Sequence, residues 1–116
     1  MNWYQELYLS PNLKGSEKYI HWLVESGWSL RPVYIIVLSE LKDGQLEILP
    51  LSLLRLPFWK KEDYDILGVA KGYYHARSLV ATILSDVYEI TGDCDAGSFF
   101  RERMQKPQSN TQEREG

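Results

Sequence analysis

Apolar residues recur along the chain with two different periods, and each period predicts one kind of element. Alternation of apolar and polar residues, or a short β-branched run, favours a strand, whereas recurrence every three to four residues favours a helix. The run at residues 33–38 is apolar on both faces, which is typical of a central strand covered on both sides or packed tightly on one. Strands are predicted at residues 5–9, 33–38, 45–49 and 65–70.

The first stretch with the helical period follows Gly15. Ser16 can cap the free N–H groups of a helix, and the next three large aliphatic residues, Ile20, Leu23 and Val24, share one helical face. Gly27 then provides a stop signal. The sequence therefore predicts a short helix that begins after Ser16.

A longer helix is predicted at about residues 73–91, with Gly92 as the left-handed residue that ends it. Asp93 or Asp95 can cap a further short helix that contains the pair at residues 99–100. The apolar face of the longer helix is expected to consist of Ala76, Leu79, Val80, Ile83, Val87 and Ile90.

The connecting segments have distinct compositions. Asp43-Gly44 between two apolar runs predicts a hairpin turn. Residues 51–59 are ambiguous between a helical turn and an edge strand, and residues 60–63 form a charged connection. Residues 105–116 hold no large apolar side chain, which predicts a disordered tail.

These elements predict an α+β fold in the order β-α-β-β-β-α plus a short C-terminal helix. The simplest arrangement is a two-layer sandwich, with two main helices on one face of a mainly antiparallel sheet of three to four strands. Residues 1–104 are expected to form a single globular domain, because a chain of 116 residues is too short for two.

Composition narrows the class of protein. A hydrophobic content of 44% and a charged content of 25% are typical of a globular domain, and a formal charge of −3 gives no field that would attract nucleic acid. Cys94 is the one cysteine, which favours a reducing compartment. The first ten residues do not have the pattern of a signal peptide, and the longest apolar run is too short to cross a bilayer. The prediction is a cytoplasmic protein that does not bind membranes.

The segment from Gly68 to Tyr73 is a candidate ligand site because it joins a predicted strand to a helix. The N–H groups at a helix N-terminus suit an anion, and Lys71 could add a positive charge. The segment matches neither the P-loop nor the dinucleotide fingerprint. The competing interpretation is a tight turn in which Gly68 and Gly72 serve the backbone conformation.

Metal and catalytic signatures are weak. The run from Asp93 to Gly97 resembles the start of a calcium loop, but its glycine is one place early and Met104 stands where the bidentate glutamate belongs. His21 and His75 have no partner at metal or triad spacing. We therefore predict no metal, no cofactor and no catalytic residues.

Aromatic residues are numerous and often adjacent. Neighbours on a strand point to opposite faces, so some of these side chains are expected at a surface, where aromatic residues dominate binding energy; burial under loops and the last helix is the alternative. Phe58, Trp59 and Tyr74 are the candidate interaction surface. Phe58 and Trp59 precede two lysines, and proteins that bind single-stranded nucleic acid use such aromatic and basic residues to stack bases. Glu62 and Asp63 cancel the local positive charge, which argues against nucleic-acid binding.

The block I-L-G-V-A-K-G-Y at residues 66–73 and the helix ending V-Y-E-I-T-G at residues 87–92 resemble a set of small uncharacterised bacterial proteins. In those proteins a strand of the form I-V-G-I-A-x-G-Y leads into a helix that closes with V-Y-x-x-T-G. The opening W-Y-Q-E-L-Y and the run Y-I-I-V-L at residues 34–38 are similar too. The resemblance implies one folded unit to about Arg103 and no particular activity.

The sequence therefore ranks three functions. A non-enzymatic protein-interaction module, binding another protein or itself, comes first because the aromatic pairs occur without a catalytic constellation. An anion or small-metabolite binding domain that uses the turn from Gly68 to Tyr73 comes second. Nucleic-acid binding comes third.

Overall fold

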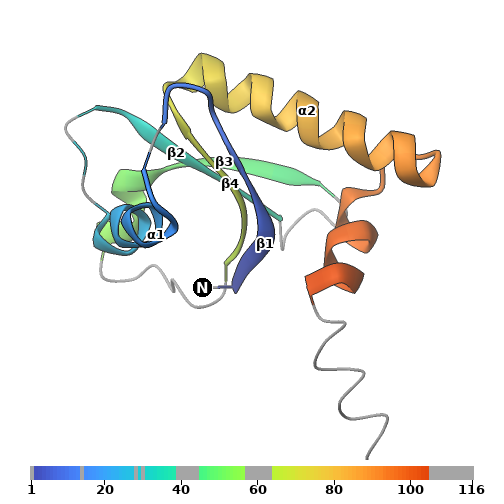
Figure 1. The fold of residues 1–116 in the computed structure, drawn as a ribbon, viewed down its shortest axis with the longest axis horizontal. Coiled ribbons are helices and arrows are strands. Elements are labelled where there is room, and N and C mark those ends of the chain that lie inside the picture. The colour runs from blue at the N-terminus through green and yellow to red at the C-terminus, as the bar shows by residue number, and fades with distance from the viewer. Residues whose placement is uncertain are drawn as a thin grey trace, which may run out of the picture.

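The computed structural model describes residues 2–13, 15–27, 29, 31–38, 45–56 and 64–104 (Figure 1). The predicted hairpin turn at Asp43-Gly44, the charged connection at 60–63 and the tail at 105–116 lie outside these residues. A short helix without a label covers residues 96–104, after the labelled elements. In chain order, the elements are β1 (Asn2–Leu9), α1 (Glu17–Ser26), β2 (Val33–Leu38), β3 (Leu46–Pro50), the 3-10 helix η1 (Leu51–Arg55), β4 (Asp65–Lys71) and α2 (Tyr73–Thr91).

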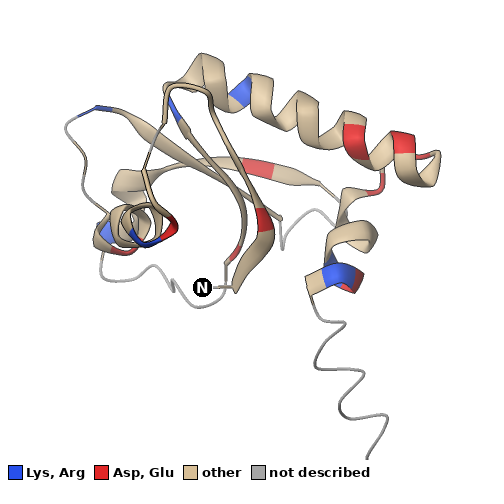
Figure 2. Cartoon of the chain, viewed as in Figure 1, with Lys and Arg blue, Asp and Glu red and all other residues tan. Residues whose placement is uncertain are grey.

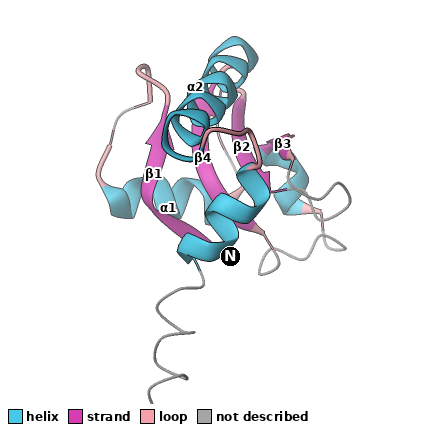
Figure 3. Cartoon of the chain, turned by 90° about the vertical axis from the view of Figure 1, so that its right-hand side faces the viewer, coloured by secondary structure: helices cyan, strands magenta, loops and turns pink. Residues whose placement is uncertain are grey.

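The four strands form one sheet in the order β1-β4-β2-β3, and Figure 3 shows them side by side in this order. β2 is antiparallel to both of its neighbours, β3 and β4, and β1 runs parallel to β4. The predicted α+β class, the mainly antiparallel sheet and the central position of β2 are confirmed. The ambiguous stretch after β3 begins as η1, with Leu51 and Leu54 buried.

The prediction that both main helices share one face of the sheet is wrong. α2 lies on one face, and α1 lies with η1 on the other (Figure 1). The physical reason is in β2, where Ile36 and Leu38 pack in the core beneath α2 while Val33, Ile35 and Val37 pack in the core beneath α1. Because β2 is apolar on both faces, each face needs its own cover.

Local signals explain where the helices begin and end. Ser16 Oγ accepts a hydrogen bond of 3.1 Å from Tyr19 N at the start of α1, and Gly27 ends α1 with a φ of 70°. Gly92, with a φ of 84°, ends α2. Ile90, predicted on the apolar face of α2, is 62% exposed, because the last turns of α2 run past the sheet (Figure 1).

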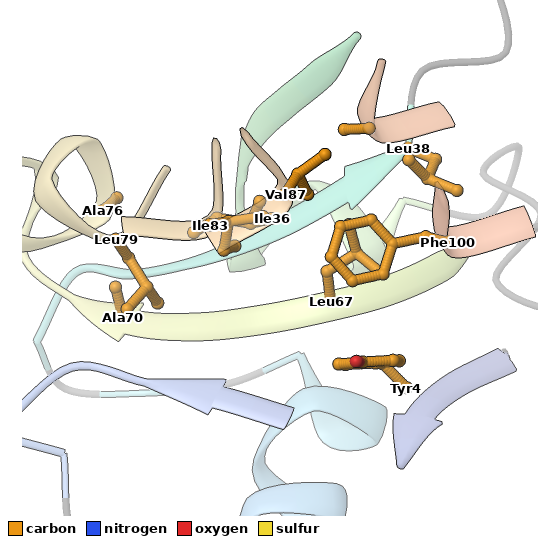
Figure 4. Packing of buried hydrophobic residues seen from close by; sticks show 11 residues of the cluster. Tyr4, Ile36, Leu38, Leu67, Ala70, Ala76, Leu79, Ile83, Val87 and Phe100 are labelled. Atoms are coloured by element: carbon orange, nitrogen blue, oxygen red, sulfur yellow. The ribbon is translucent and has the colours of Figure 1, made fainter. Parts of the chain in front are cut away.

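The short helix at residues 96–104 closes the core beneath α2. Asp95 caps it by accepting a hydrogen bond of 3.1 Å from Ser98 N, which confirms one of the two predicted caps. Phe100 is completely buried, and its ring meets the ring of Tyr4 edge to face at 4.9 Å (Figure 4). This contact joins the last helix to the first strand.

Candidate functional site

The predicted site from Gly68 to Tyr73 is split between a buried strand and the start of α2. Gly68 lies within β4, and a Cβ atom there would come within 3.1 Å of Leu79 Cδ2 and of the Tyr8 carbonyl oxygen. Gly68 therefore serves close packing between β1, β4 and α2. Gly72 has a φ of 96°, a conformation that favours glycine, and directly precedes Tyr73.

Backbone groups of this turn are held by neighbouring segments. Gly72 N donates a hydrogen bond of 2.9 Å to the Pro32 carbonyl, and Lys71 N donates one of 3.1 Å to Ser10 Oγ. Asn12 Nδ2 donates to the Lys71 carbonyl at 3.0 Å. The turn is thus hydrogen-bonded to the segment that follows β1 and to the segment that precedes β2. Anion binding at the turn stays a prediction.

The predicted interaction residues are distributed unevenly. Tyr74 is 75% exposed on α2, whereas Phe58 and Trp59 lie outside the described residues. A second exposed aromatic pair lies on α1, where the Trp22 side chain is 56% exposed and its ring lies 6.1 Å from the ring of Tyr19. The structure therefore places exposed aromatic side chains on both helical layers.

The two histidines lie on different layers. His21 on α1 stacks on Trp3 of β1 with ring centroids 3.9 Å apart, and His75 on α2 meets Tyr74 at 5.4 Å. Within the described residues, no group of three His, Cys, Asp or Glu side chains could hold a metal ion. Cys94 is exposed. The histidines are thus engaged in ring contacts and are not brought together.

A groove of about 540 Å³ lies along β1, beside α1. β1 is at the edge of the sheet, and among the described residues no strand pairs with its outer side. Between Trp3 and Tyr8, β1 advances five residues while β4 advances two, so β1 departs from regular pairing along the groove. The described residues that line the groove are Trp3, Tyr4, Gln5, Glu6, Leu7, Leu9, Gly15, Glu17, Ile20 and His21.

The groove combines an apolar wall with an acidic rim. The stacked rings of Trp3 and His21 contribute to its wall, and Ile20 of α1 is buried beside them. Glu6 and Glu17 are exposed carboxylates, and neither lysine nor arginine is among the described residues that line the groove. Sequence reasoning missed this groove because it depends on α1 lying beneath the edge strand. A sequence signal for the groove exists in β1. Because side chains of a strand point alternately to its two faces, Trp3, Gln5, Leu7 and Leu9 share one face, and three of these four are apolar.

Comparisons of the chain with protein-family models, with curated proteins and with solved structures found no match. Among the helices of the described part of the chain, none is both long and apolar enough to span a bilayer. The functional argument therefore depends on the geometry of the surface itself.

Proposed function

We propose that this domain is a non-enzymatic protein-interaction module that binds an extended segment of another protein along β1. The observation that carries the proposal is the groove of about 540 Å³ between the sheet edge and α1. An extended segment can add a strand to an exposed sheet edge through backbone hydrogen bonds, while alternate side chains enter neighbouring pockets.

The two edges of the sheet differ in a way that favours β1. β3 has five residues and ends at Pro50, and both a short length and a proline discourage further pairing. β1 has eight residues, contains no proline and carries a single charge, on Glu6 (Figure 2). Among the described strands, β1 is therefore the longer of the two edges and the one without proline, and its irregular pairing between Trp3 and Tyr8 confines regular strand addition to part of its length.

The charges of the groove define the chemistry of the partner. Glu6 and Glu17 favour a segment that carries lysine or arginine. A second copy of this chain would bring the same carboxylates to the same edge, which disfavours self-association along β1. We infer a basic, extended partner segment.

The test is selection of binders from a library of random heptapeptides displayed on phage, with the full chain as target. Enriched peptides should carry lysine or arginine at a fixed position, and in NMR titrations they should shift the backbone amides of residues 3–9. The double substitution Glu6→Lys with Glu17→Lys should weaken binding about tenfold or more, which is about 1.4 kcal/mol. Both side chains are exposed, so the fold should persist in circular dichroism.

The matched control is Glu89→Lys with Glu102→Lys, which makes the same change of charge at exposed positions outside the groove and should leave binding unchanged. Tyr74→Ala tests the other predicted surface. Amide shifts centred on Tyr74, or equal weakening by both charge variants, would contradict the assignment to β1.

A second candidate, anion binding at the turn from Gly68 to Tyr73, is favoured by one observation. The first turn of α2 has no acidic residue, and Gly72 provides no side-chain cap. A phosphate-bearing metabolite at that turn should shift the amides of residues 73–75, and Lys71→Ala should abolish the response. Titration without any shift there would remove this candidate.

A cytoplasmic location belongs to the same proposal. Cys94 is an exposed free thiol, which suits a reducing compartment. The resemblance to small bacterial proteins points to the bacterial cytoplasm.

A further inference from the structure

A second pocket, of about 330 Å³, lies at the end of the sheet where β2 begins and β3 ends. Its position is fixed by the backbone, because Gly72 N donates a hydrogen bond to the Pro32 carbonyl and Val33 pairs with Lys71. The pocket is separate from the groove along β1 and shares no described lining residue with it.

Two arginines, Arg31 and Arg55, line this pocket together with Ser29 and Ser52. No aspartate or glutamate is among its described lining residues, and within the described part of the chain neither guanidinium forms an ion pair. Arginine presents a planar set of donors that matches the oxygens of a phosphate or a carboxylate. The pocket therefore concentrates positive charge and hydrogen-bond donors, and its described lining contains no counter-ion.

The arginines are attached to ordered backbone. A Cβ atom at Gly27 would come within 2.7 Å of Arg55 Cγ, so the stem of Arg55 lies directly on this glycine, whose φ of 70° also favours glycine. Arg31 N donates a hydrogen bond of 3.3 Å to Ser29 Oγ, which orders the turn that carries Arg31. Both guanidinium groups thus extend from fixed positions at an exposed surface.

The rest of the lining is apolar and indicates that a ligand would have an organic body as well as a charge. A volume of about 330 Å³ is at the lower end of the range for small-molecule sites. We propose that this pocket binds a small organic phosphate monoester, because two guanidinium groups that form no ion pair within the described residues match a dianion better than a monoanion. The apolar lining residues are Pro32, Val33, Tyr34, Pro50 and Leu51.

The experiment is NMR titration of the full chain with phenyl phosphate, inorganic phosphate and benzoate. Phenyl phosphate should shift the amides of Ser29, Val33 and Ser52, and should bind about tenfold more tightly than benzoate, which carries one charge. Inorganic phosphate should shift the same amides at higher concentration, because it lacks the apolar body.

Arg31→Gln and Arg55→Gln should each weaken phenyl phosphate binding about tenfold or more, since each removes charge-assisted hydrogen bonds. Arg55→Lys should also weaken it, because lysine keeps the charge but not the planar donors. Arg77→Gln, at an exposed position on α2, is the control and should change nothing. The proposal is overturned if no probe binds, if the glutamine variants bind as wild type, if benzoate binds as tightly as phenyl phosphate, or if the shifts centre on residues 73–75.

Discussion

Replacement of Phe100 by alanine tests how firmly the last helix is fixed to the domain. The Phe100 side chain is completely buried, and its ring contacts Tyr4 edge to face at 4.9 Å. Truncation of a buried phenylalanine to alanine costs about 3–5 kcal/mol. Part of this cost is the aromatic pair, which contributes about 0.5–1.5 kcal/mol beyond the buried area. Since a small domain has about 5–15 kcal/mol in total, Phe100→Ala should remove a large share of its stability.

The assay is urea unfolding followed by tryptophan fluorescence and by circular dichroism. The neighbouring Phe99 is a matched control, because its side chain is only partly buried and Arg103 lies 4.2 Å from its ring centre. Phe99→Ala should cost less than half as much as Phe100→Ala. Equal losses for the two variants, or a loss below about 1 kcal/mol for Phe100→Ala, would refute the assignment of Phe100 as the anchor.

Two further predictions concern β1 and its contact with β4. Tyr8 donates a hydrogen bond of 2.7 Å to Asp86 Oδ2, so Tyr8→Phe should lower stability by about 1–2 kcal/mol in urea unfolding. Burial, together with that hydrogen bond, raises the pKa of the Tyr8 hydroxyl well above its ordinary value. The stability that Tyr8 contributes is therefore complete below about pH 10 and falls as the pH rises further. The difference in unfolding free energy between wild type and Tyr8→Phe should then narrow in alkali. A difference that stays constant with pH would contradict this reasoning. Gly68→Ala should lower the stability by about 1–3 kcal/mol in thermal unfolding, because the Cβ atom of the new alanine would press on the Tyr8 backbone. An unchanged melting temperature would instead show that the sheet can adjust.

Much of the fold could be predicted because local signals and periodicity agree. The caps at Ser16 and Asp95 and the stops at Gly27 and Gly92 act within a few residues of themselves, so the sequence reveals them directly. The placement of the helices could not be derived in the same way. Which face each helix covers depends on strand order, and the pairing of β1 with β4 joins segments far apart in the sequence.

The candidate sites were harder to predict for the same reason. The sequence predicts Gly68 and Gly72 together, as a ligand site or as one turn. In the structure Gly68 is a packing glycine in a buried strand, and only Gly72 is a turn glycine with positive φ. The groove along β1 and the arginine pocket each combine residues from separate elements. Arg31 and Arg55 are unremarkable in sequence, and they line one pocket only because β2 and η1 meet at one end of the sheet.

The parallel pairing of β1 with β4 has a consequence for synthesis on the ribosome. The hydrogen bond from Asn2 Nδ2 to Asp65 Oδ1 joins residues 63 positions apart, whereas β2 and β3 are close neighbours in the chain. A growing chain can therefore form the β2–β3 pair early, whereas among the described strands β1 has no partner until β4 has been translated. Because contacts between distant segments slow folding, the sheet is completed late, and both edges of β1 stay open until β4 leaves the ribosome.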